Sequence, residues 1–154
     1  MNPLFIEDIF VQICYQINHI KSIIIIEEVS KWHKKIIRIN KWFNLSVRIK
    51  NDKNLNSMLK THNFCNLDLY YTKVTDETVS KLVNVHTLHL NCTNVTDKSV
   101  SKLVNVYTLN LSFTRVTNES VSKLVHVNTL KIWNTNVTIE CITKLRNNGC
   151  IIYD

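Results

Sequence analysis

Alternating leucines, followed by apolar residues at helical spacing, dominate the second half of the chain. In Leu67-Asp68-Leu69 the leucines alternate with a polar residue, which predicts a strand with one buried face. After a turn, Val79, Leu82 and Val83 recur at i, i+3 and i+4, which predicts one face of a short helix. The Thr75-Asp76 pair just before it offers side-chain oxygens that cap a helix start. One unit is therefore a strand, a turn and a short helix.

This unit repeats with a period of 21 residues. Each of four copies begins with a leucine: Leu67, Leu88, Leu109 and Leu130. The first two copies are identical at 14 of 21 positions, and the second and third at 13. So short a unit cannot enclose a core alone, and the copies must stack on one another. We therefore predict an α/β solenoid that ends with a strand at residues 151–153.

The repeated pattern L-x-L-x-x-T-x-V-T-D resembles the short leucine-rich repeat. Threonines stand where that family usually carries a buried Asn or Cys: Thr72, Thr93, Thr114 and Thr135. The resemblance implies a curved solenoid with parallel strands on its concave face. A buried hydroxyl needs a partner, and we expect the backbone of the turns to supply it.

The outward strand positions differ between copies, whereas the inward positions are constant. Variation on a shared scaffold favours a binding surface for an individual ligand. The candidates on this concave face are Asp68, Tyr70, His89, Asn91, Asn110, Ser112, Lys131 and Trp133. Trp133 and Tyr70 are the best anchors, because exposed aromatics bury large areas at interfaces. The alternative for Trp133 is packing over the last open strand.

The amino-terminal segment has no 21-residue period. Ile9, Ile13 and Ile17 recur at i, i+4 and i+8, and later apolar clusters predict two further short helices. Three helices of this size barely stabilise themselves, so they must lean on the repeats or on a partner. We place a helical domain at 1–42, a basic connector or degenerate first repeat at 43–66, and the leucine-rich repeats at 67–154.

The helical segment resembles the F-box. The resemblance rests on Leu4-Phe5, Asp8-Ile9-Phe10, Ile13 to Ile17 and Val29-Ser30-Lys31-Trp32. It implies docking on a Skp1-like adaptor of a cullin-based ubiquitin ligase, while the repeats hold a substrate protein. The adaptor-binding residues it implies are Phe5, Ile9, Ile13, Ile17, Val29 and Trp32. The alternative is a plain leucine-rich-repeat interaction scaffold, whose helical start only covers the first repeat.

The formal charge of +7 is concentrated in one segment. Residues 31–60 hold nine Lys and Arg against the single acid Asp52. This patch suits nucleic acid or an acidic protein surface. Because no helix-turn-helix and no aromatic RNA-binding motif accompanies it, we favour a solvated basic face and do not expect nucleic acid.

No pattern for catalysis, a cofactor or a metal is present. Gly149 is the single glycine, which excludes glycine-rich phosphate loops. The third copy replaces Asp76 and Asp97 with Asn118, a change that a helix cap tolerates and a general acid does not. We therefore expect no enzyme activity.

Five scattered cysteines without a C-x-x-C pair indicate free thiols in a reducing compartment. No signal peptide opens the chain, and no apolar run is long enough to span a membrane. We therefore predict a cytoplasmic protein, in the host cytoplasm if the source is a virus.

Overall fold

The computed structural model describes residues 41–48, 52–60 and 63–154. The six implied adaptor-binding residues, Phe5, Ile9, Ile13, Ile17, Val29 and Trp32, all lie outside these residues. Within the described residues, no helix is long and apolar enough to cross a membrane.

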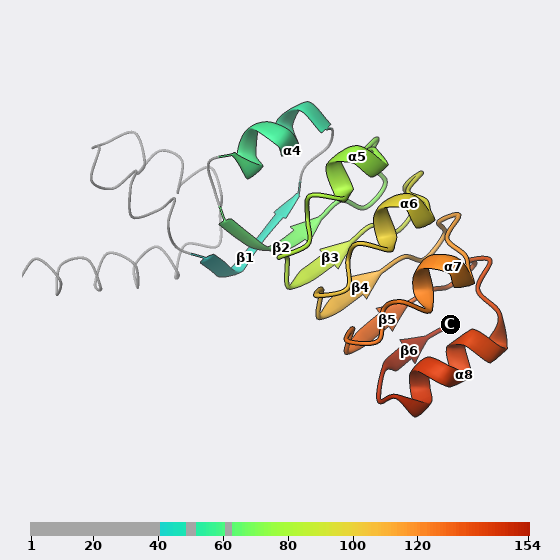
Figure 1. The fold of residues 1–154 in the computed structure, drawn as a ribbon. Coiled ribbons are helices and arrows are strands. Elements are labelled where there is room, and N and C mark those ends of the chain that lie inside the picture. The colour runs from blue at the N-terminus through green and yellow to red at the C-terminus, as the bar shows by residue number, and fades with distance from the viewer. Residues whose placement is uncertain (1–40, 49–51, 61–62) are drawn as a thin grey trace, which may run out of the picture.

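A parallel sheet runs through the molecule in sequence order (Figure 1). Its strands are β1 (Lys41–Arg48), β2 (Asn63–Asp68), β3 (Thr87–His89), β4 (Thr108–Asn110), β5 (Thr129–Lys131) and β6 (Ile151–Tyr153). The register aligns Leu67, Leu88, Leu109, Leu130 and Ile152 across neighbouring strands. This in-line stacking confirms the leucine spine that the 21-residue period predicts.

The helices line up along one side of the sheet (Figure 1). They are α4 (Asp52–Leu59), α5 (Asp76–Val79), α6 (Asp97–Val100), α7 (Asn118–Val121) and α8 (Ile139–Asn147). Each of α5, α6 and α7 is a single turn, so placing Val79, Leu82 and Val83 on one continuous helix is wrong.

The chain after α5 turns back to the sheet by short-range backbone bonds. The amides of Leu82 and Val85 donate to carbonyls three residues earlier, at 2.9 and 3.2 Å. Val79, Leu82 and Val85 are buried, whereas Val83 is only half-buried. A repeat of 21 residues must return to the next strand, which leaves room for one helical turn and little more.

The core is one continuous stack of apolar side chains from successive repeats. In the repeat that begins at Leu88, six apolar side chains are fully buried: Leu88, Leu90, Val95, Val100, Leu103 and Val106. Burying a Leu or Val side chain contributes about 1.5–3 kcal/mol each. Since neighbouring repeats complete each layer, the repeats stabilise one another.

Residues 41–59 hold a further strand and helix ahead of the four copies. β1 pairs in parallel with β2, with a register irregularity between Trp42 and Ser46. Leu55 of α4 is fully buried in the same core as the repeats. This is the segment in which the sequence predicts an irregular first repeat, although β1 begins at Lys41, inside the segment assigned to the helical domain.

The outer edge of β6 is covered by a side chain from α8. Ile151 donates to Asn128 and Tyr153 accepts from Ile132, so both face β5, and the backbone of Ile152 faces the free edge. There Arg146 Nη2 donates to the Ile152 carbonyl oxygen at 3.3 Å and pairs with the Asp154 carboxylate. An edge with an occupied acceptor is a poorer template for another strand.

Candidate functional site

Five outward-facing residues form a row across β2 to β6. Asp68, His89, Asn110, Lys131 and Tyr153 are register partners on neighbouring strands. We name this row the strand face. The first three side chains are half-buried and the last two are exposed. Lys131 Nζ lies 5.5 Å from the centroid of the Tyr153 ring, a cation–π contact. The structure thus brings the four predicted residues of this row together and adds Tyr153, which sequence reasoning missed.

The second predicted row divides into exposed and buried positions. Tyr70 is 41% exposed and Trp133 is 56% exposed, whereas Asn91 is half-buried. Ser112 is buried and offers little surface to a partner, although strand alternation predicts an outward position. The reason is that β4 ends at Asn110 and Ser112 already belongs to the turn, where its Oγ accepts from the Trp133 amide at 3.2 Å. Ser112 therefore holds the backbone of Trp133 in the next repeat.

The residue that follows this row adopts the left-handed conformation in every copy. The φ angles are +52° at Tyr71, +57° at Cys92, +58° at Phe113 and +51° at Asn134. This turn directs Tyr71 and Phe113 outward, with exposures of 79% and 56%. Sequence reasoning missed both residues, because the array offers no glycine at the position as a signal.

A threonine closes each of these turns. The Oγ1 atoms of Thr72, Thr93, Thr114 and Thr135 donate to the carbonyl three residues earlier, at 2.6, 2.6, 2.5 and 2.9 Å. This confirms the expected backbone partner for the threonine hydroxyls. The side chains of Asp68 and Asn110 also accept from the amide two residues further on, at 3.0 and 3.1 Å. These bonds hold the strand ends and the turns in a defined geometry.

Asp97 links its own helix to the next repeat. Its Oδ1 accepts from the Thr117 amide at 2.9 Å and from Ser120 Oγ at 2.5 Å, and its Oδ2 accepts from Thr117 Oγ1 at 2.7 Å. Asp76 makes the same three bonds to Thr96 and Ser99. The residue at the helix start is the threonine, so capping of their own helices by these carboxylates is wrong.

Burial and hydrogen bonding act in opposite directions on the pKa values of these carboxyl groups. Partial burial raises the pKa of Asp97. Hydrogen bonds from Ser120 and Thr117 together lower it by more than burial raises it, so the pKa lies below the ordinary 3.8. The pKa of Asp76 is lowered in the same way by Ser99 and Thr96. These carboxylates join one repeat to the next.

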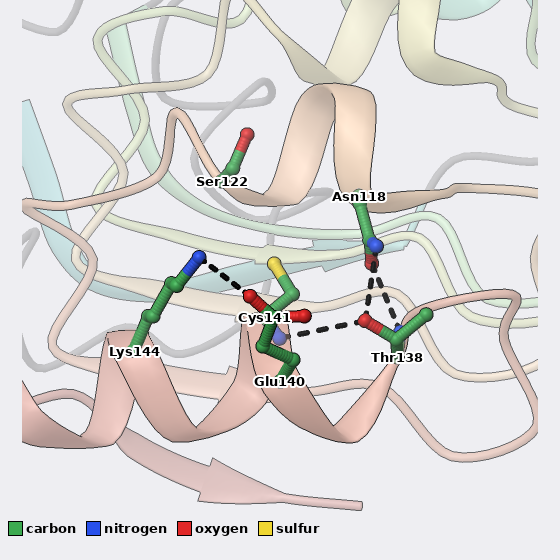
Figure 2. Close-up of a pocket in the computed structure, with 6 residues that line it drawn as sticks. All are labelled: Asn118, Ser122, Thr138, Glu140, Cys141 and Lys144. Carbon is green, nitrogen blue, oxygen red and sulfur yellow. Dashed lines mark hydrogen bonds and ion pairs between the residues drawn. The ribbon is translucent and has the colours of Figure 1, made fainter.

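A pocket of about 170 Å³ lies between α7 and α8 (Figure 2). Its lining residues are Asn118, Ser122, Thr138, Glu140, Cys141 and Lys144. Asn118 accepts from the Thr138 amide at 2.9 Å, and Lys144 pairs with Glu140 at 2.8 Å. Burial raises the pKa of the Cys141 thiol, which favours its protonated, poorly nucleophilic form. Asn118 and Cys141 occupy the positions that Asp97 and Ser120 hold one repeat earlier.

No protein-family model and no curated protein matches this chain. Among solved structures, it is similar to an internalin from Listeria monocytogenes, a leucine-rich-repeat protein, with a TM-score of 0.53 and 19% sequence identity. The similarity covers 72% of this chain and 35% of the internalin chain, so this chain spans about a third of that protein. Together with the stacked 21-residue register, this shows a leucine-rich-repeat-type solenoid fold.

Proposed function

We propose that this chain is a non-catalytic interaction protein that binds a partner protein on its strand face and the aromatic residues beside it. The observation that carries the proposal is the contrast between rows of the sheet. The inward row reads Leu, Leu, Leu, Leu, Ile, whereas the outward row reads Asp, His, Asn, Lys, Tyr. A rigid scaffold with a changeable outer row acquires one particular ligand without altering its core.

The exposed aromatic residues support the same reading. Tyr70, Tyr71, Phe113 and Trp133 are all more than a third exposed, although large apolar side chains favour burial. Aromatic side chains anchor interfaces because they remove a large apolar area from water.

Site-specific photo-crosslinking in the full chain tests this function. A benzophenone amino acid at Asn110 reports on the strand face, and the same group at exposed Lys123, beyond α7, is the matched control. We expect a discrete protein adduct from position 110 in an extract of the source cells and none from position 123. Equal labelling from both positions would contradict a binding surface on the strands.

We further propose that the amino-terminal segment joins this receptor to a cullin-based ubiquitin ligase through a Skp1-like adaptor in the cytoplasm. The support is the F-box resemblance of Leu4 to Trp32, followed along the chain by leucine-rich repeats. In this role the repeats hold the substrate protein and the chain has no reaction of its own.

Co-purification with a Skp1-like adaptor tests the ligase role. We expect Ile13→Asp and Ile17→Asp to abolish capture of the adaptor. Ile139→Asp is the matched control, because Ile139 is 68% exposed on α8. If the folded wild-type chain captures no adaptor, the plain scaffold with a helical cap is the remaining function.

A further inference from the structure

The turns that follow the strands form a second surface, which we name the rim. It comprises residues 70–73, 91–94, 112–115 and 133–136. Four large exposed aromatics belong to it: Tyr70, Tyr71, Phe113 and Trp133. The backbone bond from the Phe113 amide to the Trp133 carbonyl, at 2.7 Å, places these two residues on adjacent repeats.

The charge of the rim has one sign. Lys73 and Arg115 are exposed, and the four turns contain no Asp or Glu. Neither cation forms an ion pair within the part of the chain that the structure describes. The helix side differs, because there Glu77 pairs with Lys81 and Glu140 with Lys144. The rim is therefore cationic and aromatic, and its cations lack acidic partners in the described chain.

The repeat register sets the spacing of these groups. Neighbouring strands lie about 4.8 Å apart, so Lys73 and Arg115, two repeats apart, are separated by about 10 Å along the array. An extended peptide covers that distance in about three residues. In each of these turns, the cation follows two residues after the outward aromatic, Tyr71 or Phe113. Each of these two turns thus offers an aromatic and a cationic side chain, and the turn between them, residues 91–94, offers neither.

We propose that the rim binds an acidic peptide segment that also carries apolar side chains. Its carboxylates pair with Lys73 and Arg115, and its apolar side chains pack on Phe113 and Trp133. The inference rests on the proposed function and specifies the chemistry of the partner protein. A nucleic acid fits less well, because phosphate tracking needs more than two cations and the Asp68 carboxylate lies at the strand end beside Tyr70.

Fluorescence anisotropy of labelled probes at low salt tests the proposal with the full chain. The probes are four polymers of equal length: a Glu-Leu-Phe peptide, the matching Lys-Leu-Phe peptide, a Glu-Gly-Ser peptide and oligouridylate. We expect the Glu-Leu-Phe peptide to bind at least about tenfold more tightly than each of the others. Tighter binding of the basic peptide or of oligouridylate would overturn the inference.

Matched charge reversals locate the site. We expect Arg115→Glu to weaken the Glu-Leu-Phe peptide about tenfold, whereas Lys123→Glu on the helix side changes its affinity less than twofold. Equal effects of the two variants overturn the rim as the site. Phe113→Asn keeps a residue that tolerates the left-handed turn, so weaker binding by a folded F113N protein is not an effect of unfolding.

The two proposals fail separately. If Asn110 crosslinks a partner while the probes show no acidic preference, the strand face stands and the rim inference falls. If neither position 110 nor the probes give a signal, both proposals fall.

Discussion

A double substitution at the junction of α7 and α8 tests how repeats are joined. One repeat earlier in the chain, Asp97 accepts from Ser120 at 2.5 Å across the repeat boundary. At the equivalent positions one repeat later stand Asn118 and Cys141, which line one pocket (Figure 2). Asn118→Asp combined with Cys141→Ser places the Asp–Ser pair of the preceding junction at this one.

The two single variants are expected to gain nothing. Cys141→Ser alone places a hydroxyl at a buried site without a charged acceptor, which costs about 1–2 kcal/mol. Asn118→Asp alone keeps the bond to the Thr138 amide but finds no serine, so its effect is within about 0.5 kcal/mol. A charge-assisted hydrogen bond contributes about 1.5–3 kcal/mol, and solvent screening of the half-buried carboxylate reduces this. We therefore expect a favourable coupling of about 1–2 kcal/mol.

Urea unfolding of the four proteins at neutral pH measures this coupling as a double-mutant cycle. Repeating the cycle at a pH below the folded pKa of the new carboxyl group should abolish it, because protonation removes the charge of the acceptor. Effects that add within about 0.5 kcal/mol at neutral pH would refute the reasoning that Asp and Ser act as a bonded pair.

Three further predictions concern stability and self-association. The pKa of Asp97 lies below 3.8 in the folded chain. The stabilisation that ionised Asp97 gives the fold is therefore complete above pH 3.8 and is lost as the pH falls through the folded pKa. In urea unfolding at a series of pH values, Asp97→Asn should reduce the loss of unfolding free energy at acid pH. Phe113→Asn should raise the free energy of unfolding by about 1 kcal/mol by relieving the left-handed backbone, and a lower value contradicts it. Arg146→Ala should increase self-association in size-exclusion chromatography by freeing the Ile152 carbonyl, whereas Lys144→Ala on the same helix should leave it unchanged.

The strand register could be predicted from the sequence because two periods agree. Alternation fixes which side of each strand is buried, and the 21-residue repeat fixes which residues are neighbours. Leu67 and Leu88 had to pair once the copies were aligned. The same reasoning placed His89 beside Asn110 in one outward row.

The turns could not be predicted in this way, because the strand period stops where each strand ends. Alternation assigns Ser112 an outward position, yet its side chain is buried and accepts a hydrogen bond from the Trp133 amide. Phe113 is directed outward by a positive φ angle, and the sequence has no glycine there that would indicate such a turn. The bonds of Asp97 cross from one repeat to the next, so they follow from the stacked register and not from the local pattern.

The interchangeable junctions of the array have a consequence for its length. Asp76 bonds to Thr96 and Ser99, and Asp97 bonds to the corresponding Thr117 and Ser120. Excision of residues 88–108 would bring Asp76 against Thr117 and Ser120, donors of the same kind at the same place. Whole copies can therefore be lost or gained by recombination of the coding DNA without any new complementarity having to evolve at the seam.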